Sequence, residues 1–441
     1  MRALTVLCLG YMFITAGQLS AQEPELPLSE AVKIALANNR PAKIVELDIS
    51  KGEWAVASTK TKRLPSFSSY VFGSGTLTSP TFNFPANTFQ TSDRQPVPAT
   101  NTNVPYSHGF NGYVIAEVAQ PLTQLYKIGL AIDEQKLDVD LSRQKYEQKR
   151  QSVVADVKQA YYAILQTESA LDAATATVKQ YKETDRVVLD YIAQRSVLES
   201  SSLDVKAKLA QAQYQIIQLN NTLLTQRERL NFLMGRDLDV PFRTQQVPPE
   251  QPEEIDLKLA RQTALSQRPE VKEAEIDTRR AEYDVRLAKS QYIPDVGAAF
   301  HYTTPFNTAI LPENIAAAGF EMRWEPFEWG RRRDEVRQKD VVVQQSKYQL
   351  DEARSQVLLD VDSNFRKLEE SRSLLGVAEA ARAAANEKLR EVNDKFKQSA
   401  VLLRDVLDQE AVVATANNEY EESLLAFWSA KASFEKALGE E

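Results

Sequence analysis

The residue types that carry most enzyme chemistry are scarce in this chain of 441 residues. Its single cysteine is Cys8, and its two histidines are His108 and His301. A zinc site, a thiol nucleophile and a structural disulfide therefore lack the residues they need, and neither histidine is a good metal-ligand candidate. The chain also carries no phosphate-loop motif and no nucleophile–base motif. The sequence predicts a protein that is not an enzyme and that uses no cofactor and no metal.

The overall charge excludes a second large class of function. Lys and Arg number 53 against 61 Asp and Glu, for a net charge of −8. Such a balance argues against a nucleic-acid-binding protein, and no nucleic-acid partner is expected. Charged residues make up 26% and hydrophobic ones 43% of the chain, which is typical of neither a disordered chain nor a helical membrane protein.

The N-terminus has the pattern of a secretory signal peptide. In residues 1–21, Arg2 precedes an apolar stretch, and the small pair Ser20–Ala21 ends the segment. The residue that follows is Gln22 rather than a cysteine, so the lipoprotein pattern is absent. A short buried helix is the alternative interpretation. No later stretch approaches about 18 uncharged apolar residues, so a mature chain that enters a membrane is expected to do so as a β-barrel.

Long helices are predicted where proline disappears. No proline occurs from Leu122 to Val240 or from Phe327 to Glu441, and both stretches are rich in strong helix formers. A helix from Arg331 to about Lys397 would span roughly 100 Å, which only neighbouring helices in a coiled coil can shield. A stripe of apolar residues at helical spacing indicates packing: Val153, Val157, Ala160, Ile164 and Leu171.

Strands are expected in two proline-bounded windows, 65–121 and 294–326. Apolar Phe320, Met322 and Trp324 alternate there with Glu321, Arg323 and Glu325, and Val296, Ala298, Phe300 and Tyr302 alternate with smaller or polar residues. This period of two suits a strand between lipid and a wet lumen. The alternative is a soluble β-hairpin that caps a helical bundle. The predicted strands cover about 65–77, 106–121, 293–304 and 315–327, with a polar loop over 78–105 and a short one over 305–314.

An internal repeat relates the two halves of the chain. Ala35-Leu36 recurs as Ala264-Leu265, and Gly235 recurs as Gly439. Each half is expected to run helix, strand, loop, strand, long helix, turn, long helix. The first repeat covers 22–240, with long helices over about 122–234. A Pro-rich linker covers 241–256, and the second repeat covers 257–441, with long helices over about 329–438.

Several motifs in the two halves match those of one known family. LSEAVKIALANNR (28–40) resembles the opening motif of the TolC-like outer-membrane efflux proteins, with Arg40 where proline is usual. ALSQRPEVKEAEIDTRRAEYDVRLAKSQYIPDV (264–296) follows its second-half signature. WEPFEWGRRRDEV (324–336) resembles its strand-to-helix segment, with Trp329 replacing a glycine. The ends of the halves, LNFLMGRDL (230–238) and ASFEKALG (432–439), match as well, so the resemblance covers essentially the whole mature chain.

The resemblance implies a mixed, mainly α fold. Each duplicated half contributes a strand pair and a long coiled-coil hairpin. A homotrimer would then form one 12-stranded transmembrane β-barrel, with four strands per chain, and a periplasmic α-helical tunnel. Such proteins reside in the outer membrane of a Gram-negative type envelope. They are passive exit ducts that dock a periplasmic adaptor and an inner-membrane transporter of RND or ABC type.

The resemblance also gives a role to the turn FKQSAVLLRDVLDQE (396–410). In the family this turn carries acidic residues that ring the closed periplasmic aperture, and Asp405 and Asp408 occupy those positions. Three copies of each would gather carboxylates near one axis and attract cations. The alternative is that Asp405 is simply a polar residue that begins a helix.

The same turn departs from the family at other positions. Phe396 and Val401 stand where a tyrosine and an arginine assist closure in some members, so those gating bonds do not carry over. Arg404, beside Asp405, offers a different ion pair.

The equivalent turn of the first half, YIAQRSVLESSSLDVK (191–206), is not identical. Asp204 repeats the position of Asp408, but Ser201 repeats that of Asp405. One turn is expected to line the aperture and the other to pack outward. Both turns are candidates for contact with the adaptor.

Aromatic and basic residues mark the expected base of the barrel. Trp324, Phe327 and Trp329 are predicted to form an interfacial aromatic belt against outer-membrane lipid. The arginine run 331–333 opens a long helix, where positive charge opposes the helix dipole, so these arginines are expected to meet lipid headgroups or acidic neighbours. His301 falls on a lumen-facing strand position and His108 in a surface loop.

The leading interpretation is an outer-membrane channel subunit for efflux or secretion. The alternative is a periplasmic coiled-coil adaptor, which should carry a lipoyl-like or β-barrel domain and one helical hairpin, whereas this chain has two hairpins and two strand pairs. The exported substrate, whether drug, metal, dye or polypeptide, is not encoded in any motif of the chain.

Overall fold

A computed structural model describes residues 24–75, 77–78, 81–105, 109–194, 198–248, 255–307, 312–398 and 400–440. The expected signal peptide and His108 lie outside these residues. The chain divides into two compact units, which are described separately. Unit 1 comprises Met1–Asn39, Val153–Glu253 and Glu370–Ala432, and unit 2 comprises Arg40–Ser152, Glu254–Glu369 and Ser433–Glu441.

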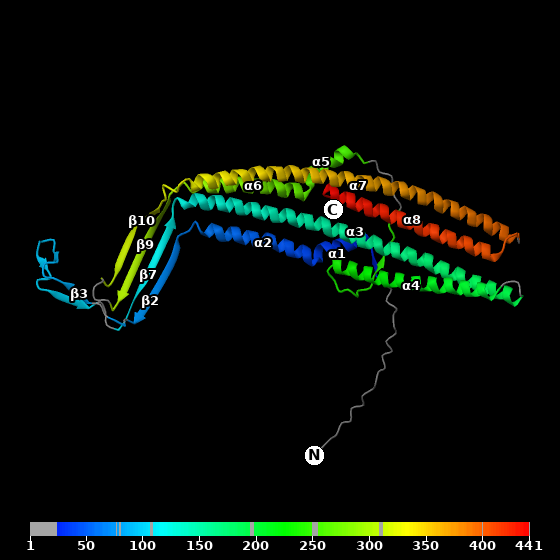
Figure 1. The fold of residues 1–441 in the computed structure, drawn as a ribbon, viewed down its shortest axis with the longest axis horizontal. Helices are drawn as coiled ribbons and strands as arrows, with labels where there is room; N and C mark the ends of the chain where they lie inside the picture. The colour runs from blue at the N-terminus through cyan, green and yellow to red at the C-terminus, as the bar shows by residue number, and fades with distance from the viewer. Residues whose placement is uncertain are drawn as a thin grey trace, which may run out of the picture. The chain divides into compact units, whose positions relative to one another are not determined.

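Unit 2 is built around an antiparallel sheet of four strands. These are β2 (Ser66–Gly75), β7 (Phe110–Pro121), β9 (Asp295–Phe306) and β10 (Ile315–Arg323). The order across the sheet is β10-β9-β7-β2, so β7 and β9, which come from different halves of the chain, lie at its centre (Figure 1). Strands β2 and β10 form its two edges.

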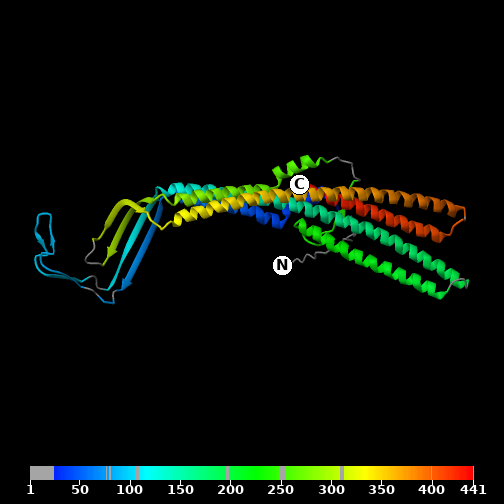
Figure 2. The ribbon, with the colours of Figure 1, turned by 45° about the horizontal axis from the view of Figure 1, so that its top comes forward.

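The helices of unit 2 pack in pairs at one end of this sheet. α2 (Arg40–Thr61) lies along the first part of α3 (Gln124–Ala193), where Val56, Ile132 and Val139 form a buried apolar cluster. α6 (Pro269–Ser290) lies along the first part of α7 (Arg331–Lys397), joined by ion pairs such as Lys339–Asp284 at 2.6 Å (Figures 1 and 2).

The segment 78–105 was expected to be a loop, and this prediction was wrong. β3 (Thr81–Phe84) pairs with β6 (Thr102–Pro105), and within this pair β4 (Phe89–Gln90) pairs with β5 (Pro96–Val97). The Phe84 and Phe89 rings pack with centroids 5.7 Å apart, and the Asn101 side chain accepts the Ala86 N–H at 2.8 Å. These local contacts order a polar, Pro-rich stretch whose composition alone suggested a loop.

Unit 1 is a bundle of two helical hairpins. The later part of α3 turns back into α4 (Glu199–Leu233), and the later part of α7 turns back into α8 (Leu403–Leu438), as Figures 1 and 2 show. Val153, Val157 and Ile164 are at most 1% exposed, which confirms that these three members of the predicted stripe pack inward, while Ala160 and Leu171 are half-buried. In the described part of the chain, no helix offers a window long and apolar enough to cross a membrane.

The beginning of the expected inter-repeat linker is fixed in unit 1. β1 (Glu25–Leu26) pairs in parallel with β8 (Arg243–Thr244), and Phe242 is 1% exposed. The buried Tyr161 hydroxyl lies 2.8 Å from the Leu26 carbonyl oxygen and accepts the Gln245 N–H at 2.6 Å. Backbone groups on both sides of the sheet pair are thus satisfied by one side chain of α3.

The internal repeat is visible in the lengths of the helices and in how they end. α1 (Leu28–Asn38) and α5 (Leu257–Gln267) both have 11 residues, while α2 and α6 both have 22. In the first half, Asn39 Nδ2 donates to the Leu233 carbonyl at 2.8 Å; in the second, Arg268 Nη1 donates to the Lys436 carbonyl at 3.2 Å. Equivalent positions therefore cap the last carbonyls of α4 and α8 with different side chains.

Candidate functional site

The register of the four-stranded sheet aligns the alternation of all its strands, so large apolar side chains from every strand share one face. Phe300 on β9 lies opposite Val118 on β7 and Ala318 on β10. The apolar face so formed comprises Phe67, Val71, Val114, Val118, Phe300, Tyr302, Phe320 and Met322.

This apolar face is open in the single chain. Phe67 is 73%, Phe320 81% and Met322 63% exposed. Large apolar side chains gathered on one exposed face indicate a membrane or protein environment rather than water. The sequence predicted the alternation, and the register shows that it is coherent from edge to edge.

The opposite, more polar face carries Glu117, His301 and Glu321 nearer the helices, and farther along the strands it carries Tyr70, Phe72 and Tyr113, whose rings pack together. His301 on β9 lies opposite Glu117 on β7, with Nδ1 and Oε2 3.9 Å apart, and both side chains are partly exposed. This places His301 on the polar face, as its position in the alternation predicted. Among the described residues no group of three His, Cys, Asp or Glu side chains is arranged to hold a metal ion.

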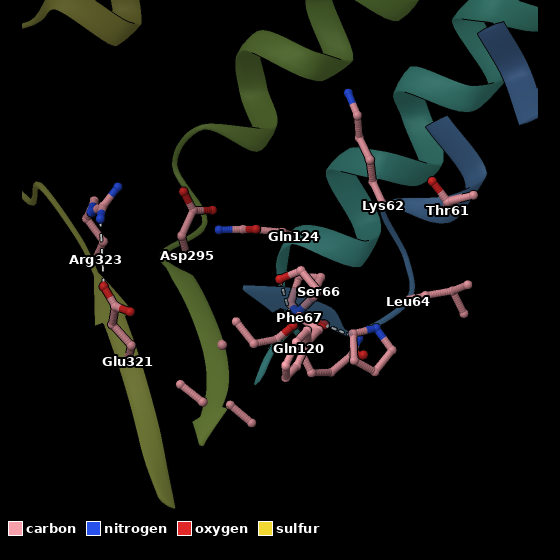
Figure 3. Close-up of a pocket in the computed structure, with 16 residues that line it drawn as sticks. Thr61, Lys62, Leu64, Ser66, Phe67, Gln120, Gln124, Asp295, Glu321 and Arg323 are labelled. Atoms are coloured by element: carbon pink, nitrogen blue, oxygen red, sulfur yellow. Dashed lines mark hydrogen bonds and ion pairs between the residues drawn. The ribbon is translucent and has the colours of Figure 1, made fainter. Parts of the chain in front are cut away.

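A polar cavity of about 730 Å³ lies where the strands meet the helices (Figure 3). Its lining includes Lys62, Gln124, Asp295, Glu321 and Arg323, which come from four separate segments of the chain. Charges of both signs and amides line it, so the cavity can hold water and hydrated solutes but offers no reactive constellation. The sequence analysis missed this cavity because the residues are scattered along the chain.

The first turn of α3 is tied to the start of β9. Lys127 Nζ pairs with Asp295 Oδ1 at 2.7 Å, and its side chain is only 14% exposed. Thr123 Oγ1 donates to the Pro294 carbonyl at 2.6 Å and accepts the Val296 N–H at 2.8 Å. These bonds join a helix of the first half to a strand of the second, and no motif in the sequence predicts them.

The aromatic belt residues are among the most exposed of the chain. Trp324 is 52%, Phe327 70% and Trp329 90% exposed. The rings of Phe327 and Trp329 pack edge to face with centroids 4.8 Å apart. Tyr126 and Tyr292, which adjoin the strand ends in α3 and after α6, are 56% and 51% exposed and were missed by the sequence analysis.

The acidic residues of the second turn have distinct partners. Asp405 lies in the first turn of α8, and its carboxylate accepts the Leu402 N–H at 2.9 Å. This contact is half of a capping box. Asp408 Oδ1 accepts from Gln180 Nε2 on α3 at 2.6 Å, which links the two hairpins of unit 1. Asp405 thus begins a helix, as the alternative interpretation held, and this role is compatible with a place at an aperture.

The two residues of this turn that depart from the family pattern are both partly accessible. Phe396 near the end of α7 is 40% exposed, and Val401 is half-buried. The side chain of Arg404 lies outside the described part, so its expected ion pair with Asp405 stays a prediction.

The first turn is organised differently. Ser202 is 3% exposed, and its hydroxyl lies 3.3 Å from Asp185 Oδ1 on α3. Ser201 is half-buried and Asp204 is exposed. Ser201 therefore provides no carboxylate where the second turn has Asp405, and the exposed acidic residues of this turn are Glu199 and Asp204.

Comparison with known proteins decides the family. The family described as outer membrane efflux protein matches residues 32–236 and 260–440, which is most of the chain. The chain belongs to the outer membrane efflux protein family. No curated protein matches it.

Solved structures of outer-membrane channels share the fold at low sequence identity. The Campylobacter jejuni CmeC outer membrane channel is 15% identical over 99% of this chain and 94% of its own, with a TM-score of 0.73. The Neisseria gonorrhoeae MtrE outer membrane channel, in its open state, is 16% identical over 94% and 89%, with a TM-score of 0.69. The Vibrio cholerae outer membrane protein VceC is 15% identical over 94% and 96%, with a TM-score of 0.68.

Family membership gives the function and the location of the protein. The protein is an outer-membrane efflux channel subunit, with its strands in the outer membrane and its helices in the periplasm. Channels of this family are trimers that work with a periplasmic adaptor and an inner-membrane transporter. The interpretation as an adaptor is not favoured.

Proposed function

We propose that three copies of this chain close one 12-stranded barrel and one helical duct, which is passive and is energised by a transporter of RND or ABC type. The observation that carries the proposal is the four-stranded sheet, with β2 and β10 as its edges and an exposed apolar face. Four strands cannot close a barrel alone, and open strand edges are not tolerated in lipid. Joining β10 of one copy to β2 of the next removes both edges. A stably folded monomer after detergent extraction would contradict this assembly.

We further propose that Asp405 and Asp408 form an acidic ring at the periplasmic end of the duct. Both lie at the turn between α7 and α8, and both carboxylates are accessible enough to interact with a passing cation. The turns at this end, including Phe396, Val401, Ser201 and Asp204, are also the proposed contact surface for the adaptor.

Single-channel conductance in a planar bilayer tests the duct and its ring. The variant is Asp405→Asn/Asp408→Asn, which removes the two charges but keeps an oxygen that can accept the Leu402 and Gln180 hydrogen bonds. We expect the wild-type channel to prefer cations and the variant to lose that preference. Asp204→Asn, at the equivalent position of the other turn, serves as the control and should retain it.

The outcomes of this experiment test the acidic ring and the conducting duct separately. Equal selectivity in the double variant and the control would keep the channel and refute the acidic ring. A wild-type protein that inserts correctly and never conducts would refute the open duct.

A further inference from the structure

The three arginines that open α7 are not equivalent. Arg331 contacts Glu328 at 2.5 Å, Glu335 at 2.8 Å and Glu325 at 3.7 Å. The Arg332 side chain is 17% exposed and pairs with Glu328, which is itself 10% exposed. Carboxylates thus neutralise these two guanidinium groups and offset the charge that opposes the helix dipole.

Arg333 differs in both exposure and charge balance. Its side chain is 63% exposed, and its ion pair in the described part of the chain is with the adjacent Asp334 at 3.2 Å. Asp334 also contacts Arg337 at 3.5 Å, so one carboxylate serves two arginines and a positive charge is left over. A guanidinium with this surplus can bind an added anion, and its planar donors suit a phosphate.

The Arg333 head group lies beside Gly330, the residue that follows Trp329 of the aromatic belt. Its Nη2 atom is 3.4 Å from the place where a Cβ on Gly330 would sit, and Gly330 follows Trp329 directly. Trp329 and Phe327 are the most exposed aromatic side chains of the belt. Trp324 directly follows the last residue of β10, whose Phe320 and Met322 belong to the apolar face, so the belt adjoins that face in the sequence.

We propose that Arg333 binds the phosphate of a phospholipid in the periplasmic leaflet of the outer membrane, with the acyl chains resting on the aromatic belt and the apolar face. This inference rests on the proposed function, because it requires the sheet to span the membrane. The helices begin at this end of the strands, so the headgroup faces the periplasm. A lipid fits better than a free phosphate because the cation adjoins a large exposed apolar surface, where amphipathic groups gather.

Native mass spectrometry of the intact, purified channel tests the site. The delipidated protein is mixed with phosphatidylethanolamine, and separately with diacylglycerol of the same chains or with inorganic phosphate as a competitor. Arg333→Ala is compared with Arg337→Ala, a matched control that is 68% exposed and contacts the same Asp334 oxygen one turn further along α7. We expect Arg333→Ala to weaken phosphatidylethanolamine retention about fivefold and Arg337→Ala to leave it unchanged.

A second variant and three outcomes keep the inference open to refutation. Trp329→Ala, whose side chain is 90% exposed, should also weaken retention, since the belt carries the acyl chains. Equal retention by Arg333→Ala and Arg337→Ala would overturn the site. Equal retention of diacylglycerol would show that the phosphate is not recognised, and full displacement by inorganic phosphate would show an anion site without lipid. The conductance of the wild-type preparation is also measured. A channel that conducts but does not retain phosphatidylethanolamine would contradict the lipid site and leave the proposed channel function standing.

Discussion

At the scale of single residues, a half-buried charged side chain lowers the stability of the fold when one of its atoms lacks a hydrogen-bond partner. Glu273 on α6 is half-buried, and its Oε1 atom has no hydrogen-bond partner in the described structure. Desolvation raises the pKa of this carboxyl, nearby Glu270 and Asp277 raise it further, and Lys145 opposes them. Burial that disfavours the charged form makes Glu273 a destabilising residue at neutral pH.

The sign of the pH dependence follows from the raised pKa. In the folded protein the pKa of Glu273 lies above its ordinary value of 4.5. The neutral carboxyl therefore leaves the folding free energy at its full value below that pH. This part of the stability is lost as the pH rises through the folded-state pKa and Glu273 becomes charged. We expect Glu273→Gln to raise the unfolding temperature at pH 7, with the difference shrinking in acid. Thermal unfolding from pH 4 to pH 8 measures this. Glu275→Gln, which removes the exposed ion pair with Arg354 at 3.1 Å, should give no such gain.

At the scale of elements, the two halves end their long hairpins with the same glycine but under different packing. Gly235 has φ 69° and Gly439 has φ 87°, which glycine adopts without strain at a helix C-terminus. A Cβ on Gly235 would lie 2.3 Å from the Asn38 carbonyl oxygen, whereas on Gly439 the nearest atoms would be 3.2 Å away. Any other residue would strain the backbone at both positions. Only a substitution at Gly235 would also push α1 away from the end of α4.

Alanine at these two positions should therefore have unequal effects. Gly439→Ala is expected to cost about 1–2 kcal/mol of unfolding free energy from the left-handed backbone alone. Gly235→Ala should cost more, because a backbone atom must move. Chemical denaturation of each variant checks the order, and equal losses would show that α1 shifts freely.

At the scale of the whole molecule, the two faces of the sheet decide which side meets lipid. Phe300 and His301 are neighbours on β9 with similar exposure, at 43% for Phe300 and 46% for the His301 side chain, yet they point to opposite faces. Family membership places the strands in the outer membrane, so the apolar face is the one against acyl chains.

An arginine on each face tests this orientation. Phe300→Arg is expected to cost ~2–4 kcal/mol of membrane stability if it lies near the bilayer midplane, whereas His301→Arg on the polar face should cost far less. The fraction of assembled trimer in the outer-membrane fraction reports the difference. A larger loss for His301→Arg would reverse the assignment of the faces.

Much of this architecture was determined by the sequence itself. Strand alternation, proline-free helices and the repeat are local or periodic signals, and they predicted the alternating strands and the two hairpins. The family came from the resemblance of motifs such as LSEAVKIALANNR (28–40) and WEPFEWGRRRDEV (324–336). The position of His301 and the inward packing of Val153, Val157 and Ile164 followed from spacing alone.

Only the tertiary structure decided features that join distant segments. Three such features connect residues far apart in the chain. They are the cavity of Figure 3, the Lys127–Asp295 ion pair, and the hydrogen bond between the Tyr161 hydroxyl and Gln245 in the linker. The tertiary structure also showed the strand pairs within residues 81–105 and the different ion-pair partners of Arg331, Arg332 and Arg333. Periodicity fixes which face a side chain lies on, but its partners depend on how separate elements meet, and no local pattern records that.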